Sequence, residues 1–167
     1  MSLARAICRT MAAGLLLACL ACSASTLDPQ KFEALRTDAQ SVQADIRSGD
    51  GSSSRLPELL RRLDAEIAAT GRRVTGRQEH AALAAYADAA EAYRYVLRFR
   101  NLDRETIGGM LLLRGSNRPI ALRYQVPFEE RGGGHWVSRT TAMDTFARSA
   151  DAAFAKALDI VGTSKGR

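Results

Sequence analysis

The sequence predicts an all-α fold, a four-helix bundle-like domain with a long irregular insertion between its third and fourth helices. Three observations lead to this prediction. Four segments repeat apolar residues at spacings of three and four, the period of a helix that buries one face. Proline and glycine stand at the ends of these segments, where helices start and stop. One further segment, residues 105–137, lacks the period and holds six of the glycines.

The first two helices are predicted on either side of a short polar turn at residues 49–54. Asp28 before Pro29 is the expected N-cap of the first helix, and Gly49 its expected stop. Pro57 opens the second helix, which ends near Gly71. The expected buried stripes are Phe32, Leu35, Ala39, Val42 and Ile46 in the first helix, and Leu56, Leu59, Leu60, Leu63 and Ile67 in the second.

The third helix is predicted over residues 76–102 and should be central, because two apolar seams run along it. Thr75 and Gln78 before it have capping-box spacing. Tyr86 and Tyr93 are expected to pack in the core, the alternative being that they line a cavity for an apolar ligand. The last helix is predicted from residues 138–141 to residue 161, with Gly162 as its stop. Its expected inward residues are Met143, Ala147, Ala150, Phe154, Leu158 and Val161.

The insertion at residues 105–137 is expected to be irregular. Residues 110–113 predict either a short helix or a strand, and residues 120–127 an extended segment. Residues 115–119 have the composition of a turn, and residues 132–134, three glycines, require a mobile or strained backbone. Because an irregular stretch of this length in a compact domain is usually functional or disordered, the insertion is where we expect a site.

The N-terminal segment has the three-part plan of a secretory signal. Arg5 and Arg9 precede an apolar run over residues 11–20, and small residues come after it. A helix that spans a bilayer needs roughly 20 apolar residues, so this segment predicts a cleaved signal and not a membrane span. All three cysteines of the chain lie within it, and the mature domain is therefore expected to have no internal disulfide.

The residues Leu16-Leu17-Ala18-Cys19 resemble the lipobox of bacterial lipoproteins. That resemblance implies diacylglycerol attached through a thioether to Cys19 and cleavage just before it. Cys22, with Ala21 before it and Ser23 after it, is the alternative lipidation site. The expected organisation is a signal peptide over residues 1–18, a tether over 19–27, a helical domain over 28–162 and a flexible tail over 163–167.

The same resemblance predicts a protein of the bacterial cell envelope, held to a membrane through its N-terminal lipid. In lipoproteins of enteric bacteria, aspartate after the cysteine favours retention in the inner membrane. Leu20 or Ser23 occupies that position here, which favours the outer membrane, facing the periplasm. The alternative is ordinary signal cleavage that leaves a soluble periplasmic protein.

The charge balance does not indicate nucleic-acid binding. The formal net charge is +6, and removal of the signal with Arg5 and Arg9 leaves 22 basic and 18 acidic residues. Because both signs alternate along the predicted helices, these charges are more typical of solvated helix faces than of a track for phosphates. We expect no nucleic-acid partner.

Residue patterns for cofactors and metals are also missing from the sequence. It contains no CxxCH, ExxH or HExxH pattern and no glycine-rich phosphate loop. Its two histidines, His80 and His135, are too few for a multi-histidine metal site, and His80 is expected to be a surface residue. We expect no cofactor and no metal.

Four residues of the insertion are the candidate binding site: Arg118, Arg123, His135 and Trp136. Arginines around a histidine and a tryptophan would suit a carboxylate, a phosphate or an acidic protein surface. The alternative is that Trp136 plugs the end of the bundle while the arginines pair with nearby glutamates.

These observations give three functional hypotheses. The first is a noncatalytic, lipid-anchored domain that binds an envelope component through the insertion. The second is a periplasmic small-ligand binder or sensor, with a pocket between the insertion and the tyrosine face of the third helix. The third is a hydrolase that uses His135 with a nearby carboxylate. The partner and the oligomeric state stay open.

Overall fold

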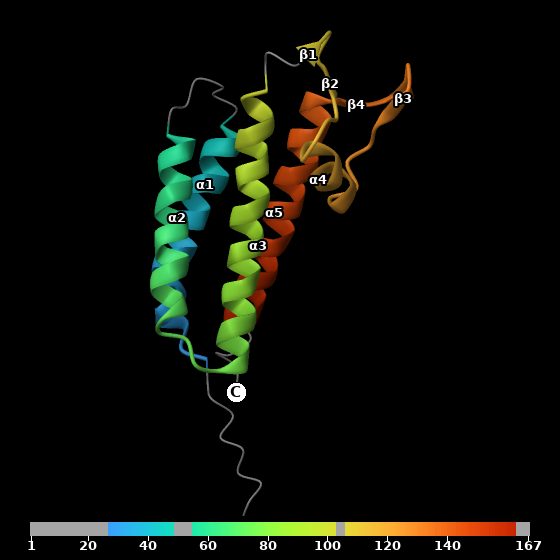
Figure 1. The fold of residues 1–167 in the computed structure, drawn as a ribbon. Helices are drawn as coiled ribbons and strands as arrows, with labels where there is room; N and C mark the ends of the chain where they lie inside the picture. Colours follow the sequence, from blue (N-terminus) through green and yellow to red (C-terminus); the bar gives the residue numbers. More distant parts are fainter. Residues whose placement is uncertain (1–26, 49–54, 103–105, 163–167) are drawn as a thin grey trace, which may run out of the picture.

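The computed structural model describes residues 27–48, 55–102 and 106–162, which form a mostly helical domain (Figure 1). In chain order its elements are η1 (Pro29–Phe32), α1 (Glu33–Arg47), α2 (Leu56–Gly71), α3 (Arg77–Arg100), β1 (Thr106–Ile107), β2 (Met110–Leu112), α4 (Asn117–Arg123), β3 (Glu129–Arg131), β4 (Gly134–Ser138) and α5 (Arg139–Gly162). The predicted signal peptide, both candidate lipidation sites, Cys19 and Cys22, and the predicted tail lie outside the described residues. Within the described ranges, none of the helices combines the length and apolar character needed to cross a bilayer.

Helix boundaries agree with the predicted start signals, with one correction. The Asp28 side chain accepts a hydrogen bond of 3.0 Å from the backbone N–H of Gln30, so the predicted cap before Pro29 is confirmed. The predicted capping pair Thr75 and Gln78 is wrong. The N-cap of α3 is Gly76, and Glu79 at the third helical position accepts from the backbone N–H groups of Thr75 and Gly76. The predicted pair lies one residue too early in the chain. A glycine N-cap has no side chain by which the sequence could reveal it.

The four long helices, α1, α2, α3 and α5, bury one shared hydrophobic core. We call these four helices the bundle. Tyr86 and Tyr93 of α3 lie in this core, 1% and 0% exposed, so their predicted core packing is confirmed. Tyr86 also borders a small pocket of about 120 Å³ with Phe32 and Leu158. Burial raises the pKa of Tyr86 to about 12.

The segment predicted as an irregular insertion instead forms a sheet and a short helix. Residues 110–112 are a strand, one of the two predicted alternatives, whereas the extended chain predicted over 120–127 is wrong because α4 covers its first half. Pro119 is compatible with α4 since it lies in the first turn, where no backbone N–H is needed. Gly132 and Gly133 adopt φ of +56° and +75° and make the tight turn between β3 and β4.

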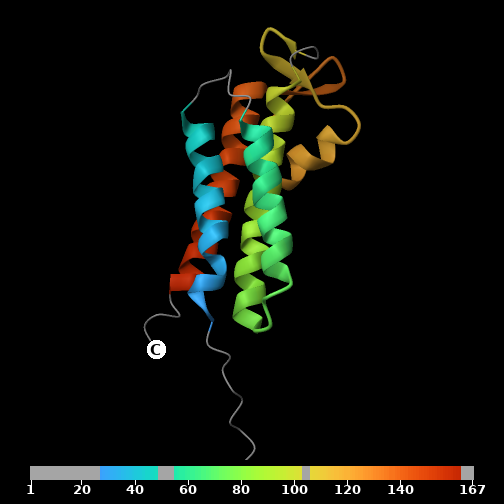
Figure 2. The ribbon, with the colours of Figure 1, turned by 90° about the vertical axis from the view of Figure 1, so that its left-hand side faces the viewer.

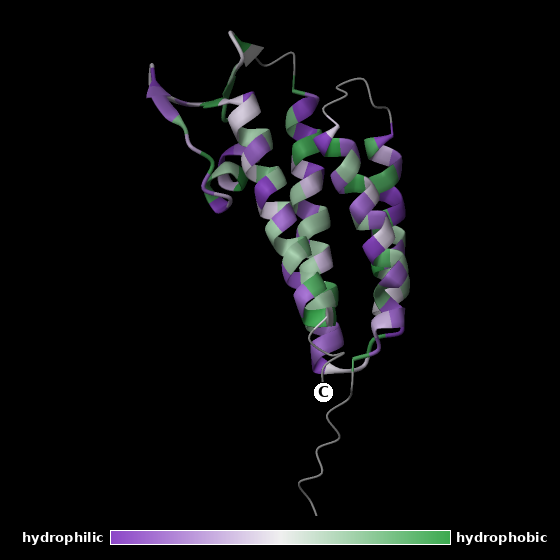
Figure 3. Ribbon diagram, turned by 180° about the vertical axis from the view of Figure 1, so that it is seen from behind, coloured by the Kyte–Doolittle hydropathy of each residue, from purple (hydrophilic) through white to green (hydrophobic). Residues whose placement is uncertain are grey.

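The sheet is antiparallel with the strand order β1-β2-β4-β3. Leu111 of β2 lies opposite Val137 of β4, and both side chains are buried against the bundle. They belong to a second hydrophobic cluster, which also contains Phe99 of α3 and Phe146 of α5. β3 is hydrophilic and exposed along its whole length (Figure 3). One face of the sheet is therefore attached to the upper part of α3 and α5 by its own apolar contacts.

The insertion and the two ends of the described chain lie at opposite ends of the bundle (Figures 1 and 2). η1 and the C-terminal end of α5 lie at the lower end in these views, and the sheet lies at the upper end. α3 has 24 residues, which corresponds to a length of about 36 Å at 1.5 Å per residue. A tether that leads to Leu27 would thus hold the molecule by the end that is remote from the sheet.

Candidate functional site

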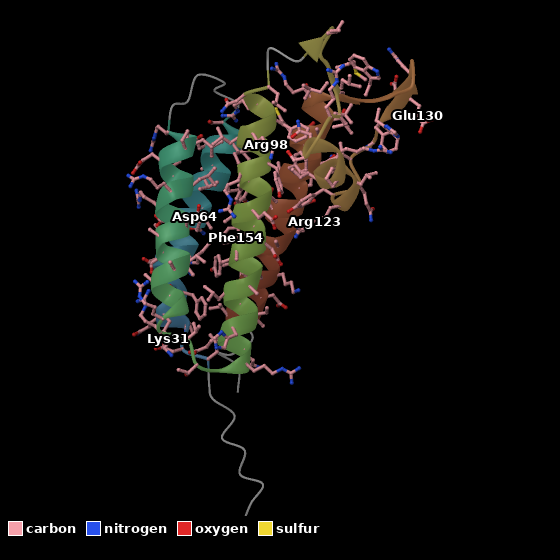
Figure 4. All side chains as sticks on the ribbon, viewed as in Figure 1. Lys31, Asp64, Arg98, Arg123, Glu130 and Phe154 are labelled. Carbon is pink, nitrogen blue, oxygen red and sulfur yellow. The ribbon has the colours of Figure 1, made fainter. Side chains whose placement is uncertain are left out.

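Arg123, one of the four predicted binding residues, forms an ion pair within the molecule. Its guanidinium donates to both carboxylate oxygens of Glu91 on α3, at 2.8 and 3.1 Å, and lies above the ring of Tyr124. The hydrogen bond with Glu91 raises the pKa of the Arg123 guanidinium. Arg123 extends from α4 toward α3 (Figure 4). We interpret it as a tie between these two helices and not as a ligand-binding group.

His135 and Trp136 are neighbours on β4 and therefore point to opposite faces of the sheet. His135 lies on the face toward the bundle, where its ring contacts Phe128 edge-on at 4.8 Å between centroids. Its Nε2 lies 3.3 Å from Oε1 of Glu130, which sits on the outlying hairpin (Figure 4). Arg118 is exposed on α4, a separate element. Because Arg123 is held by α3 and the two residues of β4 diverge, the four predicted residues do not converge on a single site.

The third hypothesis requires a carboxylate near His135, and within the described residues Glu130 lies there. No hydroxyl or thiol hydrogen-bonds to His135 there, and the Glu130 side chain is 76% exposed. Among the same residues, no group of three or more His, Cys, Asp or Glu side chains could hold a metal ion. His80 is exposed, as expected.

On the outer face of the sheet, which points away from the bundle, the part formed by β1, β2 and β4 is mostly apolar, whereas β3 adds Glu129 and Arg131. The strand register places Ile107 opposite Met110, and Leu112 opposite Trp136. Ile107 is 73% exposed, although it is a large aliphatic residue. Together with the turn after β2, this face borders an open groove of about 500 Å³. The groove is lined by Ile107, Leu112, Arg114, Gly115, Ser116, Asn117 and Trp136. Of the four predicted residues, only Trp136 lines it.

Trp136 is held across the β3–β4 hairpin. Its indole Nε1 donates to the backbone oxygen of Arg131 at 3.2 Å. Gly134 lies on the same face, and a Cβ there would stand 2.7 Å from Leu112 Cδ1 and 3.3 Å from Trp136 Nε1. Glycine at this position therefore allows the leucine and the indole to lie closely over the strand, which sets the shape of the groove.

Replacing Gly134 by alanine is expected to displace the Leu112 and Trp136 side chains. The cost in free energy of unfolding should be small, about 1 kcal/mol, because the closest atom is the end of a flexible side chain. Trp136 is the single tryptophan of the chain, so its emission spectrum should shift while the far-ultraviolet circular dichroism stays unchanged. Gly162→Ala, where no atom lies within 4 Å of the added Cβ, is the control. An unchanged emission spectrum would contradict this role of Gly134.

Asn117 supplies an unsatisfied polar group at the floor of the groove. The residue is 9% exposed, and within the described residues its side-chain oxygen Oδ1 accepts no hydrogen bond. Leaving a buried acceptor without a partner costs about 1–3 kcal/mol. This oxygen is itself shielded from solvent, so a ligand in the groove does not reach it.

Arg114 supplies a cation at the rim. It lines the groove, is exposed, and takes part in no ion pair within the described ranges. The backbone oxygen of Arg114 accepts from the backbone N–H of Asn117 at 3.1 Å, which closes the turn and brings the two residues together. The groove therefore combines an aromatic ring, aliphatic walls and an exposed guanidinium.

A second polar cluster, in the bundle, is structural. Asp151 of α5 accepts hydrogen bonds from Gln43 at 2.8 Å, Tyr93 at 2.9 Å and Arg47 at 2.9 Å. Burial by itself would raise the pKa of Asp151, but these donors outweigh it and lower the pKa. Because both oxygens are occupied and the donors come from α1 and α3, the cluster ties three helices together and leaves no group free for a ligand.

The sequence places a site in the insertion but does not reveal Arg114, Asn117 or the outer face. Residues 115–119 have only the composition of a turn, and a strand of three residues is too short to indicate which of its side chains face outward. Which side chains of β2 and β4 face outward becomes clear only once the pairing of these two strands is known. No family model, curated protein or solved structure matches this chain.

Proposed function

We propose that this chain is a lipid-anchored protein of the bacterial envelope that binds another envelope component, without catalysis, through the groove beside Trp136. The observation that carries the binding role is the groove itself, which joins exposed apolar surface to the exposed guanidinium of Arg114. Exposed apolar surface that is rimmed by polar groups is typical of interaction sites. The anchor is inferred from the lipobox resemblance, with Cys19 as the lipidated residue and Cys22 as the alternative.

The shape of the domain supports this combination. From Cys19 to Leu27 the chain has eight Cα–Cα steps, a reach of about 28 Å at most. The lower end of the bundle is therefore kept near the membrane, and the groove is carried about 36 Å further by the length of α3. In the outer membrane, with the lipid in the inner leaflet, the groove faces the periplasm.

The lipid is tested by metabolic labelling with an alkyne fatty acid. Wild type and the Cys22→Ala variant should carry the label, and Cys19→Ala should lose it, since the thioether requires that sulfur. Label that is lost only in Cys22→Ala would move the anchor to the alternative cysteine. A wild-type chain without label would contradict the anchor and favour a soluble periplasmic protein.

The binding role is tested by photocrosslinking in the native envelope. A benzoylphenylalanine at position 107 should give defined crosslinked products, because Ile107 is 73% exposed beside the groove. The same group at Arg61, an exposed position on α2, is the control. Trp136→Ala should weaken the products from position 107. Identical products from positions 107 and 61, or none from position 107, would contradict the proposed site.

A further inference from the structure

The groove beside Trp136, if it is the binding site that the proposed function requires, has features that narrow the chemistry of its ligand. Ile107 and Leu112 give it aliphatic walls next to the indole. The guanidinium of Arg114 favours an anion, above all a carboxylate. A fitting ligand therefore has an apolar part and a negative charge close together.

The charges of the insertion favour the same kind of ligand. Residues 105–137 contain four arginines and three glutamates, an excess of one positive charge. Arg123 is paired with Glu91, and Arg131 with Glu129. Glu130 lies beside His135 on the other face of the sheet. Among the residues that the structure describes, the groove is thus left with an arginine that forms no ion pair and without an opposing acidic side chain in its lining.

We propose that the groove binds an acidic peptide segment of a partner protein. An apolar side chain of the segment packs between Ile107, Leu112 and Trp136. A neighbouring aspartate or glutamate pairs with Arg114. A volume of about 500 Å³ accommodates two or three residues of this kind.

A peptide suits this surface better than a glycan does. A sugar ring carries hydroxyls around its rim, and Ile107 and Leu112 would leave those hydroxyls without partners. A neutral glycan would also make no use of the Arg114 charge. Anionic lipid is disfavoured by position, since the groove lies at the end of the bundle opposite Leu27, where the tether begins.

The test uses the emission of Trp136, which reports directly on the groove because no other tryptophan is present. The full chain, as processed in cells, is screened against a library of hexapeptides with acetylated N-termini and amidated C-termini. The selected peptides should contain Asp or Glu within two positions of a large apolar residue. Titration of the best peptide should change the emission of Trp136 with saturation.

Two substitutions make the assignment specific. Arg114→Gln should lower the affinity for the selected peptide at least tenfold. Asp→Asn or Glu→Gln in the peptide should lower it by a similar factor. When both changes are combined, the loss of affinity should be little larger than for either change alone, because both remove the same ion pair. Arg118→Gln, an exposed arginine of α4 outside the groove, is the matched control and should change affinity less than twofold.

Three outcomes would overturn the inference. The first is that the selected peptides lack an acidic residue, and the second is that Arg114→Gln and Arg118→Gln lose equal peptide affinity. The third is that soluble glycan fragments or anionic vesicles, and not peptides, change the emission of Trp136. If crosslinks from position 107 persist in any of these cases, only the ligand class is wrong and the proposed binding role stands. If neither crosslinks nor peptide binding occur, both the peptide assignment and the proposed binding function are wrong.

Discussion

Replacing Phe146 by alanine is expected to lower the free energy of unfolding by about 3–5 kcal/mol and to loosen the sheet from the bundle. Phe146 is completely buried. Its ring lies 4.9 Å from Phe99, 5.2 Å from Tyr124 and 5.5 Å from Tyr95, measured between centroids. The cavity left by alanine would open at the point where α3, α5 and the segment after α4 meet. Total stability is typically about 5–15 kcal/mol, so this loss is severe.

The measurement is urea unfolding monitored by both circular dichroism and the emission of Trp136. Phe154→Ala is the matched control, because Phe154 is also buried in α5 but belongs to the core of the four long helices. In the folded state, only Phe146→Ala should change the emission of Trp136. A loss below 1 kcal/mol, or an equal change of emission in both variants, would contradict the role assigned to Phe146.

Phe146 also shows where the sequence pattern stops being informative. The predicted inward stripe of the last helix contains Ala150 and Phe154, which are buried, but it omits Phe146. A single stripe is expected for a helix that buries one face. The N-terminal part of α5 packs on both α3 and the sheet, so its buried surface is wider than one stripe. The sheet forms by pairing of strands that are distant in the sequence. The apolar spacing within the helix therefore does not predict which of its residues the sheet covers.

The four long helices could be predicted because their signals are local: caps, prolines and a repeated apolar spacing within each segment. The sheet could not, since its strands have two to five residues and depend on contacts with one another. The same contrast explains the candidate site. Trp136 is conspicuous in the sequence, whereas Arg114 becomes a candidate only when the groove that it lines is known.

Acidification is expected to destabilise the domain between about pH 4.5 and pH 2 through Glu79. This carboxylate, with 2% of its side chain exposed, accepts from the backbone N–H of Thr75 at 2.8 Å and of Gly76 at 3.2 Å, and pairs with Lys31 at 2.8 Å. Burial by itself would raise the pKa of Glu79. Lys31, these two backbone donors and a backbone hydrogen bond from Asp28 outweigh burial and lower the pKa from 4.5 to about 2.

The lowered pKa fixes the direction of this pH dependence. The unfolded chain takes up a proton at Glu79 near pH 4.5, whereas the folded protein resists doing so until about pH 2. The stabilisation is therefore complete above the unfolded pKa and is lost as the pH falls through this window. Since one pKa unit corresponds to about 1.36 kcal/mol, the contribution at neutral pH is about 3 kcal/mol.

Glu79→Gln should remove most of that contribution at neutral pH and flatten the dependence of stability on pH between 4.5 and 2. Chemical unfolding at a series of pH values measures both effects. Glu58→Gln is the control, because Glu58 forms an exposed ion pair with Arg61 on α2 and should contribute well under 1 kcal/mol. A pH profile that is the same in wild type and Glu79→Gln would show that other carboxylates govern acid unfolding.

Lys31→Met separates the ion pair from the helix cap. The two backbone donors would still hold Glu79, so its pKa should rise only part of the way toward 4.5 and the acid midpoint should move upward. Lys31 belongs to η1, four residues after Leu27, whereas Glu79 begins α3. The pair therefore fastens the start of the domain to its central helix, at the end where the proposed lipid tether would attach. Amide hydrogen exchange in Lys31→Met should accordingly increase first in η1, with the β2–β4 pairing still protected; a uniform increase would contradict this local role.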